Sequence, residues 1–214
     1  MKKIIWIAAA GLLAIPANSQ DKNGWGTEKS YLAVSAGVAV PILCYGSKNT
    51  GNPNAGFAKP GFSIDLSYAY RFNNTIGVAG SVFYAFNNAG SSAVKAVSSP
   101  GSYRLIGLLA GPVLSRNFSD RWAGDIKFLA GVSRSMTPEL QYGDGTLLND
   151  HSVNAFTWGG GIALRYKLSG NTFLQLKTDH VNLKPKFRMQ AGETGKNEQH
   201  IVLMNVDAGV GWKF

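Results

Sequence analysis

Cysteine is almost absent from this sequence, and charged residues are scarce. Cys44 is the single cysteine among 214 residues, so an intramolecular disulfide is impossible and a cysteine-based zinc site is excluded. We interpret it as a small residue near a strand end. Charged residues make up 15% of the chain, against about 25% in soluble domains. With 26 glycines and 11% aromatics, this composition favours a barrel that faces lipid over a soluble domain.

A second helical-length apolar run is also lacking. A membrane-spanning helix needs about 20 apolar residues. After the first twenty residues the nearest approach is 159–168, and Arg165 interrupts it. By hydropathy this is not a helical membrane protein.

The first twenty residues have the organisation of a secretory leader. Lys2 and Lys3 give a positive start, 4–15 form an apolar core too short to span a membrane, and 17–19 supply small residues. We predict a signal peptide over 1–19 and export of the mature chain. No cysteine directly follows the cleavage point, which argues against a lipid anchor.

The remaining charge is basic. The formal net charge is +9, or +7 (9 − 2) once Lys2 and Lys3 leave with the leader. Nucleic acid is an obvious partner for a basic chain, but export and the scattered basic positions argue against it. A loop-rich segment holds four basic residues that could meet lipopolysaccharide phosphates, although a solvated loop is the simpler interpretation. They are Lys184, Lys186, Arg188 and Lys196.

Apolar and polar residues alternate from Tyr31 to the end of the sequence, as in strands with two different faces. In 61–72, for example, Phe62 and Ile64 share one face while Ser63 and Asp65 share the other. The last segment places its apolar residues from Val202 to Phe214 on one face. The pattern predicts eight strands: 31–41, 61–72, 76–86, 102–114, 122–133, 153–168, 172–183 and 201–214. In 102–114 both faces are apolar, so the pattern leaves the phase open.

The connections between these segments alternate in length. Long connections (42–60, 87–101, 134–152, 184–200) alternate with short ones (73–75, 115–121, 169–171). Outer-membrane barrels are built from tight periplasmic turns and extended extracellular loops. The sequence therefore predicts an all-β fold over 20–214, an eight-stranded antiparallel transmembrane up-and-down β-barrel with four long extracellular loops.

Alternation alone also fits a soluble barrel with an apolar interior, and three features favour the membrane form. The polar faces carry mostly small residues with isolated charges. Aromatic residues gather at strand ends, as interfacial girdles require. The sequence ends in Trp212-Lys213-Phe214.

The leader, the eight alternating segments and the terminal sequence Asp207-Ala-Gly-Val-Gly-Trp-Lys-Phe214 resemble the small OmpA/OmpX-type outer-membrane β-barrel family. The resemblance implies insertion into the outer membrane of a Gram-negative bacterium, among its lipids and lipopolysaccharide. It also implies that the barrel-assembly machinery reads the last strand. A terminal strand offers backbone hydrogen bonds and alternate side chains for recognition, here Val210, Trp212 and Phe214. Alternatively, Trp212 and Phe214 are only lipid anchors.

With the polar faces turned inward, seven charged residues lie in or near the lumen. Eight strands leave an interior just wide enough for side chains to fill, so mixed charges predict a plug of ion pairs. A narrow, gated, porin-like pore through the same residues is the alternative. The seven residues are Asp65, Asp125, Lys127, Arg165, Lys177, Asp179 and Asp207.

A barrel enzyme is a further alternative, because the chain has three histidines that could act as a catalytic base. The histidines are His151, His180 and His200, and His180 has the parity of the outer face. This is similar to lipid A deacylase barrels, in which a membrane-facing histidine and serine lie two residues apart. Asn182 occupies the serine position, so nucleophile and base are not both present. We therefore predict a non-enzymatic protein, with no cofactor and no metal, that contributes to envelope structure or surface interaction through its four long loops.

The glycines at 159–161 are not followed by a helix and do not form a nucleotide-binding loop. We attribute them to close strand packing or barrel curvature.

Overall fold

A computed structural model gives the fold of the chain. It describes residues 29–49, 55–90, 97–137, 140–142, 147–148, 152–188 and 196–214. The predicted signal peptide lies outside these residues. Within them, no helix is both long and apolar enough to cross a membrane.

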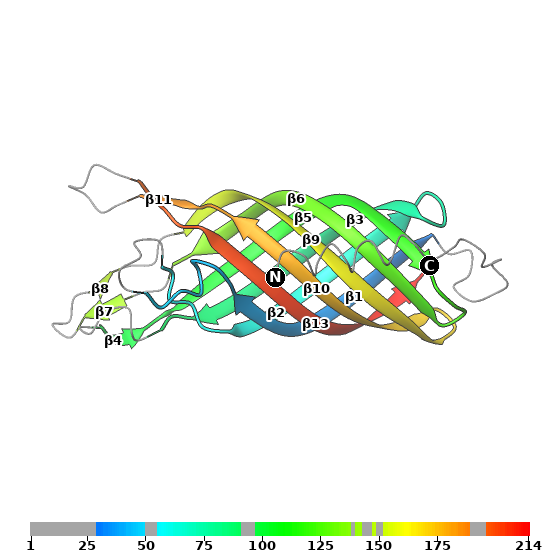
Figure 1. Cartoon of the computed structure of the whole chain (residues 1–214), viewed down its shortest axis with the longest axis horizontal. Helices are drawn as coiled ribbons and strands as arrows, with labels where there is room; N and C mark the ends of the chain where they lie inside the picture. The colour runs from blue at the N-terminus through cyan, green and yellow to red at the C-terminus, as the bar shows by residue number, and fades with distance from the viewer. Residues whose placement is uncertain are drawn as a thin grey trace.

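Eight long strands form one closed antiparallel barrel, which confirms the predicted fold class (Figure 1). Each strand pairs with the next long strand along the chain, and the last closes the barrel on the first. Closure leaves no unpaired edge for lipid to contact. The strands are β1 (Ser30–Pro41), β2 (Gly61–Arg71), β3 (Ile76–Asn88), β5 (Ser102–Asn117), β6 (Trp122–Met136), β9 (Ser152–Ser169), β10 (Thr172–Leu183) and β13 (Ile201–Lys213).

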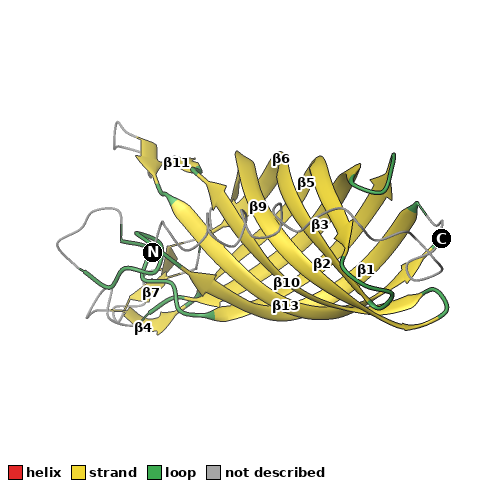
Figure 2. Cartoon of the chain, turned by 45° about the vertical axis from the view of Figure 1, so that its right-hand side comes forward, coloured by secondary structure: helices red, strands yellow, loops and turns green. Residues whose placement is uncertain are grey.

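The two ends of the barrel differ. The turn end carries the short connections 72–75, 118–121 and 170–171 together with Phe214, and the loop end carries the four long connections. Among the described residues, five short strands lie at the loop end, where no strand was predicted, and Figure 2 labels β4, β7 and β11 among them. β4 pairs with β7 and β7 with β8, while β11 pairs with β12. They are β4 (Val97–Pro100), β7 (Leu140–Tyr142), β8 (Leu147–Leu148), β11 (Lys186–Arg188) and β12 (Lys196–Glu198).

The side chains alternate between lipid and lumen as predicted. Ile64 is 45% exposed on the outer wall, and Asp65 next to it is 3% exposed inside. The terminal strand has one exception. Val202, predicted to face outward, is fully buried, because it lies at the loop end, where the chain leaving β1 runs along β13 and Ile42 N donates to Val202 O at 3.0 Å.

The structure fixes the phase of β5. Leu105, Leu109 and Val113 are buried in the lumen, whereas Ile106, Leu108 and Leu114 are exposed on the outer wall. This sector of the lumen is apolar, and for that reason both faces of the strand are apolar.

Aromatic pairs mark both ends of the outer wall. At the turn end the ring centroids of Trp122 and Tyr166 lie 4.8 Å apart. At the loop end Phe62 lies 5.9 Å from Tyr84 and 5.7 Å from Phe86. Rings at these two levels form the girdles typical of a barrel that spans a bilayer.

Candidate functional site

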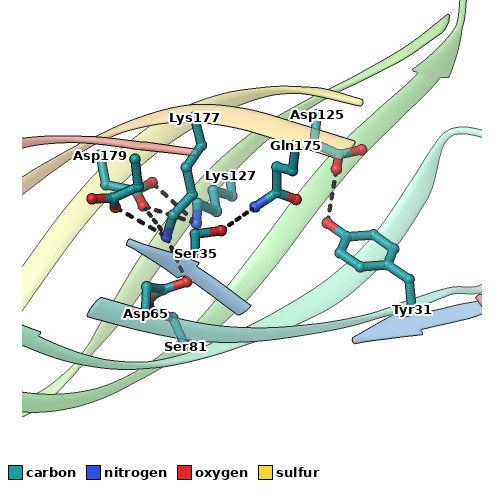
Figure 3. A network of polar contacts seen from close by, with 10 residues as sticks. Tyr31, Ser35, Asp65, Ser81, Asp125, Lys127, Gln175, Lys177 and Asp179 are labelled. Atoms are coloured by element: carbon teal, nitrogen blue, oxygen red, sulfur yellow. Dashed lines mark hydrogen bonds and ion pairs between the residues drawn. The ribbon is translucent and has the colours of Figure 1, made fainter. Parts of the chain in front are cut away.

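The seven charged residues singled out in the sequence all reach the lumen, where they form two groups. Five of them make the Lys177 cluster, which comprises Asp65, Lys127, Lys177, Asp179 and Asp207. Figure 3 labels all of these residues except Asp207. The other two belong to the Arg165 cluster, which comprises Tyr31, Ser115, Asp125, Arg165 and Phe173.

Lys177 is the centre of its cluster. Its Nζ lies 2.5 Å from Asp65 Oδ1, 2.9 Å from Asp179 Oδ2 and 3.6 Å from Asp207 Oδ2. Lys127 Nζ lies 3.0 Å from Asp179 Oδ1. Ion pairs as buried as these are strongly coupled, because little water remains to screen the charges.

Serine hydroxyls complete the Lys177 cluster. Ser81 donates to Asp65 and Ser63 donates to Asp207. Farther along the lumen, Gln175 Nε2 donates to Ser35 Oγ at 3.2 Å. These polar residues share the inward parity of the charged ones, so the alternation could have identified them.

The Arg165 cluster depends on geometry as well as charge. Arg165 is fully buried, and its Nη2 lies 2.6 Å from Asp125 Oδ1. Tyr31 Oη donates to the other carboxylate oxygen of Asp125 at 2.7 Å, and Ser115 Oγ donates to Oδ1 at 2.6 Å. The guanidinium carbon lies 4.4 Å from the centroid of the Tyr31 ring and 5.7 Å from that of Phe173. Such stacking is typical of arginine and unavailable to lysine.

The two clusters differ in charge balance. The Lys177 cluster holds three carboxylates and two amines, a formal charge of −1 (2 − 3), while Asp125 and Arg165 balance each other. A charge inside the barrel is tolerated when it is paired and hydrogen-bonded. The ion pairs of the Lys177 cluster join β2, β6, β10 and β13 across the lumen.

Little space remains beside the Lys177 cluster. A cavity of about 20 Å³ lies against Asp65, Lys127, Asp179 and Asn205, and such a volume is enough for about one water molecule. Gly161 forms part of its wall. A Cβ at Gly161 would lie 1.9 Å from Asp179 Oδ1, so the missing side chain makes room for this carboxylate.

The first long connection covers the loop end of the lumen. Tyr45 is 2% exposed and belongs to the same buried apolar cluster as Leu105 and Leu203. Its ring lies 5.3 Å from that of Tyr103, edge to face, and Tyr103 Oη donates to Gly56 O at 2.9 Å. Burial raises the pKa of Tyr45 well above its usual range, because a phenolate there would lose its hydration. We call residues 42–49 and 55–60 the cap.

The structure describes two of the three histidines, His180 and His200. His180 is half-buried, with its ring 5.8 Å from that of Trp158. Asn182 Oδ1 lies 3.2 Å from His200 Nε2. His151 lies outside the described residues. Within the ranges that the structure describes, no group of three or more His, Cys, Asp or Glu side chains could hold a metal ion.

The terminal strand presents its apolar face to the outside. Trp212 and Phe214 are exposed on the outer wall, Val210 is partly exposed, and the Phe214 ring lies 6.2 Å from that of Tyr68. Ser30 N donates to Phe214 O at 3.1 Å, and Phe214 N donates to Ser30 O at 3.0 Å. The last residue is therefore part of the ladder that closes the barrel.

An apolar outer wall, two aromatic girdles and a lumen filled by side chains define a small membrane-spanning β-barrel. The sequence matches the family model of the outer membrane protein beta-barrel domain over residues 6–214, and the chain belongs to this family. It is an outer-membrane β-barrel protein.

Several solved structures have a similar fold. Neisserial surface protein A (NspA) is 17% identical with a TM-score of 0.55, and the alignment covers 86% of this chain and 97% of that one. Ail of Yersinia pestis, in complex with the heparin analogue sucrose octasulfate, is 18% identical with a TM-score of 0.51. The alignment covers 87% of this chain and 99% of that one. OprG of Pseudomonas aeruginosa is 12% identical with a TM-score of 0.51, and the alignment covers 89% of this chain and 98% of that one. No curated protein matches the sequence significantly. At these identities the likeness concerns the fold.

Proposed function

We propose that the protein is a non-enzymatic outer-membrane barrel that binds anionic surface partners at its loop end, which faces the cell exterior. The observation that carries the proposal is a set of six exposed basic side chains at that end. Among the side chains described there, none is acidic. The six residues are Lys48, Lys59, Arg104, Arg134, Lys184 and Lys186.

The phosphates of lipopolysaccharide are the proposed first partner of these residues. Arg104 and Arg134 support this, because their strand parity points them outward near the loop-end girdle: Arg104 pairs with Phe86, and Arg134 with Ile106. The side chains of Arg188 and Lys196 lie outside the described set. A basic residue near an anionic lipid surface contributes about 1 kcal/mol.

Binding to immobilised lipopolysaccharide tests the proposal. Replacing Arg104 and Arg134 together by glutamine is expected to weaken binding by about fivefold per residue and to reduce its salt dependence. The matched control replaces Arg116 and Arg121, at the turn end. Equal losses in both variants, or no loss in the first, would contradict the assignment to the loop end.

A narrow pore is the second candidate function, because charged side chains line the lumen with a formal excess of one negative charge in the Lys177 cluster. The cap and the filled interior support a closed barrel instead. We expect no single-channel steps from the purified protein in planar bilayers. Reproducible steps that change with Asp207→Ala would establish the pore and contradict this expectation.

The non-enzymatic part of the proposal is supported by Asn182, which stands where a serine nucleophile would be needed and lies within hydrogen-bonding distance of His200. Deacylated product after incubation with lipid A would overturn it.

The barrel-assembly machinery is the proposed partner of Val210, Trp212 and Phe214 during insertion. If these residues are a recognition signal, Phe214→Ala should sharply lower the amount of folded protein in cells and change the stability of the refolded barrel by only about 1 kcal/mol. If Phe214 is only a lipid anchor, yield in cells should follow stability alone. Heat-modifiable gel mobility measures both.

A further inference from the structure

A groove lies in the outer wall near the turn end. Its volume is about 470 Å³, within the range of about 300–1,000 Å³ typical of small-molecule sites. Asp125, Ala163 and Lys177, whose side chains are buried on the lumen side of the wall, form its floor. Its sides are lipid-facing residues of β9, β10 and β13: Ile162, Leu164, Leu176, Thr178 and Val206.

Gly124 and the Phe118 ring line the β6 side of the groove. Gly124 occupies an outward position on β6, between Arg116 of β5 and Leu164 of β9 in the register. Phe118, from the turn between β5 and β6, leans over this position. A Cβ at Gly124 would lie 2.8 Å from Phe118 Cε2. The groove is therefore open along the wall and bounded by an aromatic ring toward the turn end.

Basic residues stand beside this bounded end. Arg116 has the outward parity of its strand and is the register partner of Gly124. Arg121 Nη1 donates to Tyr166 Oη at 3.2 Å, which holds the guanidinium next to the Trp122–Tyr166 pair at the level of the girdle. Asp120 is the single acidic residue in the turn 118–121.

We propose that this groove is a binding site for one anionic glycerophospholipid. The acyl chain lies against the apolar sides, and the phosphate is held by Arg116 and Arg121. An apolar groove that ends near the Arg121 guanidinium at the level of the girdle, with Arg116 facing outward on β5, matches a lipid along its length. Arginine favours phosphate oxygens as hydrogen-bond acceptors. The leaflet assignment rests on the proposed function, in which the loop end faces the cell exterior. The groove lies near the opposite, turn end and therefore in the periplasmic leaflet.

The test is native mass spectrometry of the full mature chain in detergent, with phosphatidylglycerol and phosphatidylcholine of identical acyl chains. The wild type is expected to prefer phosphatidylglycerol. Replacing Arg116 and Arg121 by glutamine should remove this preference, on the order of fivefold per arginine. Gly124→Leu should weaken both lipids about tenfold, the equivalent of two methylene groups.

Two controls match these changes. Gly80→Leu also adds a side chain on the outer wall, where a Cβ would come no closer than 3.7 Å to other atoms. Replacing Arg104 and Arg134 by glutamine removes the same charge at the loop end. Heat-modifiable mobility shows that each variant is folded. Equal losses in the controls, or undiminished binding in the groove variants, would overturn the site.

Competition with lipopolysaccharide is a further measurement, and it tests the lipid site separately from the orientation of the barrel. Lipopolysaccharide that displaces phosphatidylglycerol from the wild type, but not from Gly124→Leu, would show that the groove faces the outer leaflet and would overturn the proposed occupant. Loss of the lipopolysaccharide effect at Arg104 and Arg134 bears on the proposed function alone.

Discussion

Replacing Lys177 by methionine is expected to lower the free energy of unfolding by about 3–5 kcal/mol, the cost of breaking a buried ion pair on one side only. Methionine has nearly the length of lysine, so packing is largely kept and the change is mainly one of charge. Three carboxylates would then share Lys127, and the formal charge of the cluster would change from −1 to −2. Urea unfolding in lipid vesicles, followed by heat-modifiable mobility, measures the loss.

Restoring the charge balance should recover part of that loss. Lys177→Met combined with Asp65→Asn and Asp207→Asn leaves one carboxylate, Asp179, beside one amine, Lys127. Lys184→Met is the matched control, because Lys184 is exposed, and it should change stability by less than about 0.5 kcal/mol. A Lys177→Met barrel as stable as this control would show that the ion pairs contribute little.

The sequence predicted the barrel because each strand carries its own evidence. In β2, for example, every second side chain is apolar, and the register follows from this alternation and from the tight turn before β3. The short strands of the loop end could not be predicted in the same way. β8 has two residues, Leu147–Leu148, and a period of two cannot be recognised in so short a segment.

The lumen was predictable in content but not in pairing. Parity places Asp65, Lys177 and Asp207 inside the barrel, but which of them meet depends on the stagger of strands around the closed sheet. The cap escaped prediction for a related reason. Residues 42–60 are rich in turn formers and are typical of a displayed loop, yet Tyr45 belongs to the same buried apolar cluster as Leu105 and Leu203 of distant strands.

Geometry and charge can be separated at Arg165. Arg165→Met removes the cation from Asp125 in a fully buried position and is expected to cost about 3–5 kcal/mol. Arg165→Lys keeps the charge but loses the planar stacking on Tyr31 and Phe173, where a desolvated cation–π contact contributes about 2 kcal/mol. The lysine variant should therefore lie between the methionine variant and the wild type.

Arg134→Lys, on an exposed position of the outer wall, is the control for the generic effect of exchanging arginine for lysine. It should leave urea unfolding almost unchanged, because its partner Ser152 Oγ, 2.7 Å from Nη2, is a neutral surface acceptor. If Arg165→Lys proves as stable as this control, the charge of residue 165 is sufficient and its stacking on the rings is incidental. If it is as unstable as Arg165→Met, the planar guanidinium and its stacking on the two rings, and not the charge alone, hold Asp125 in the lumen.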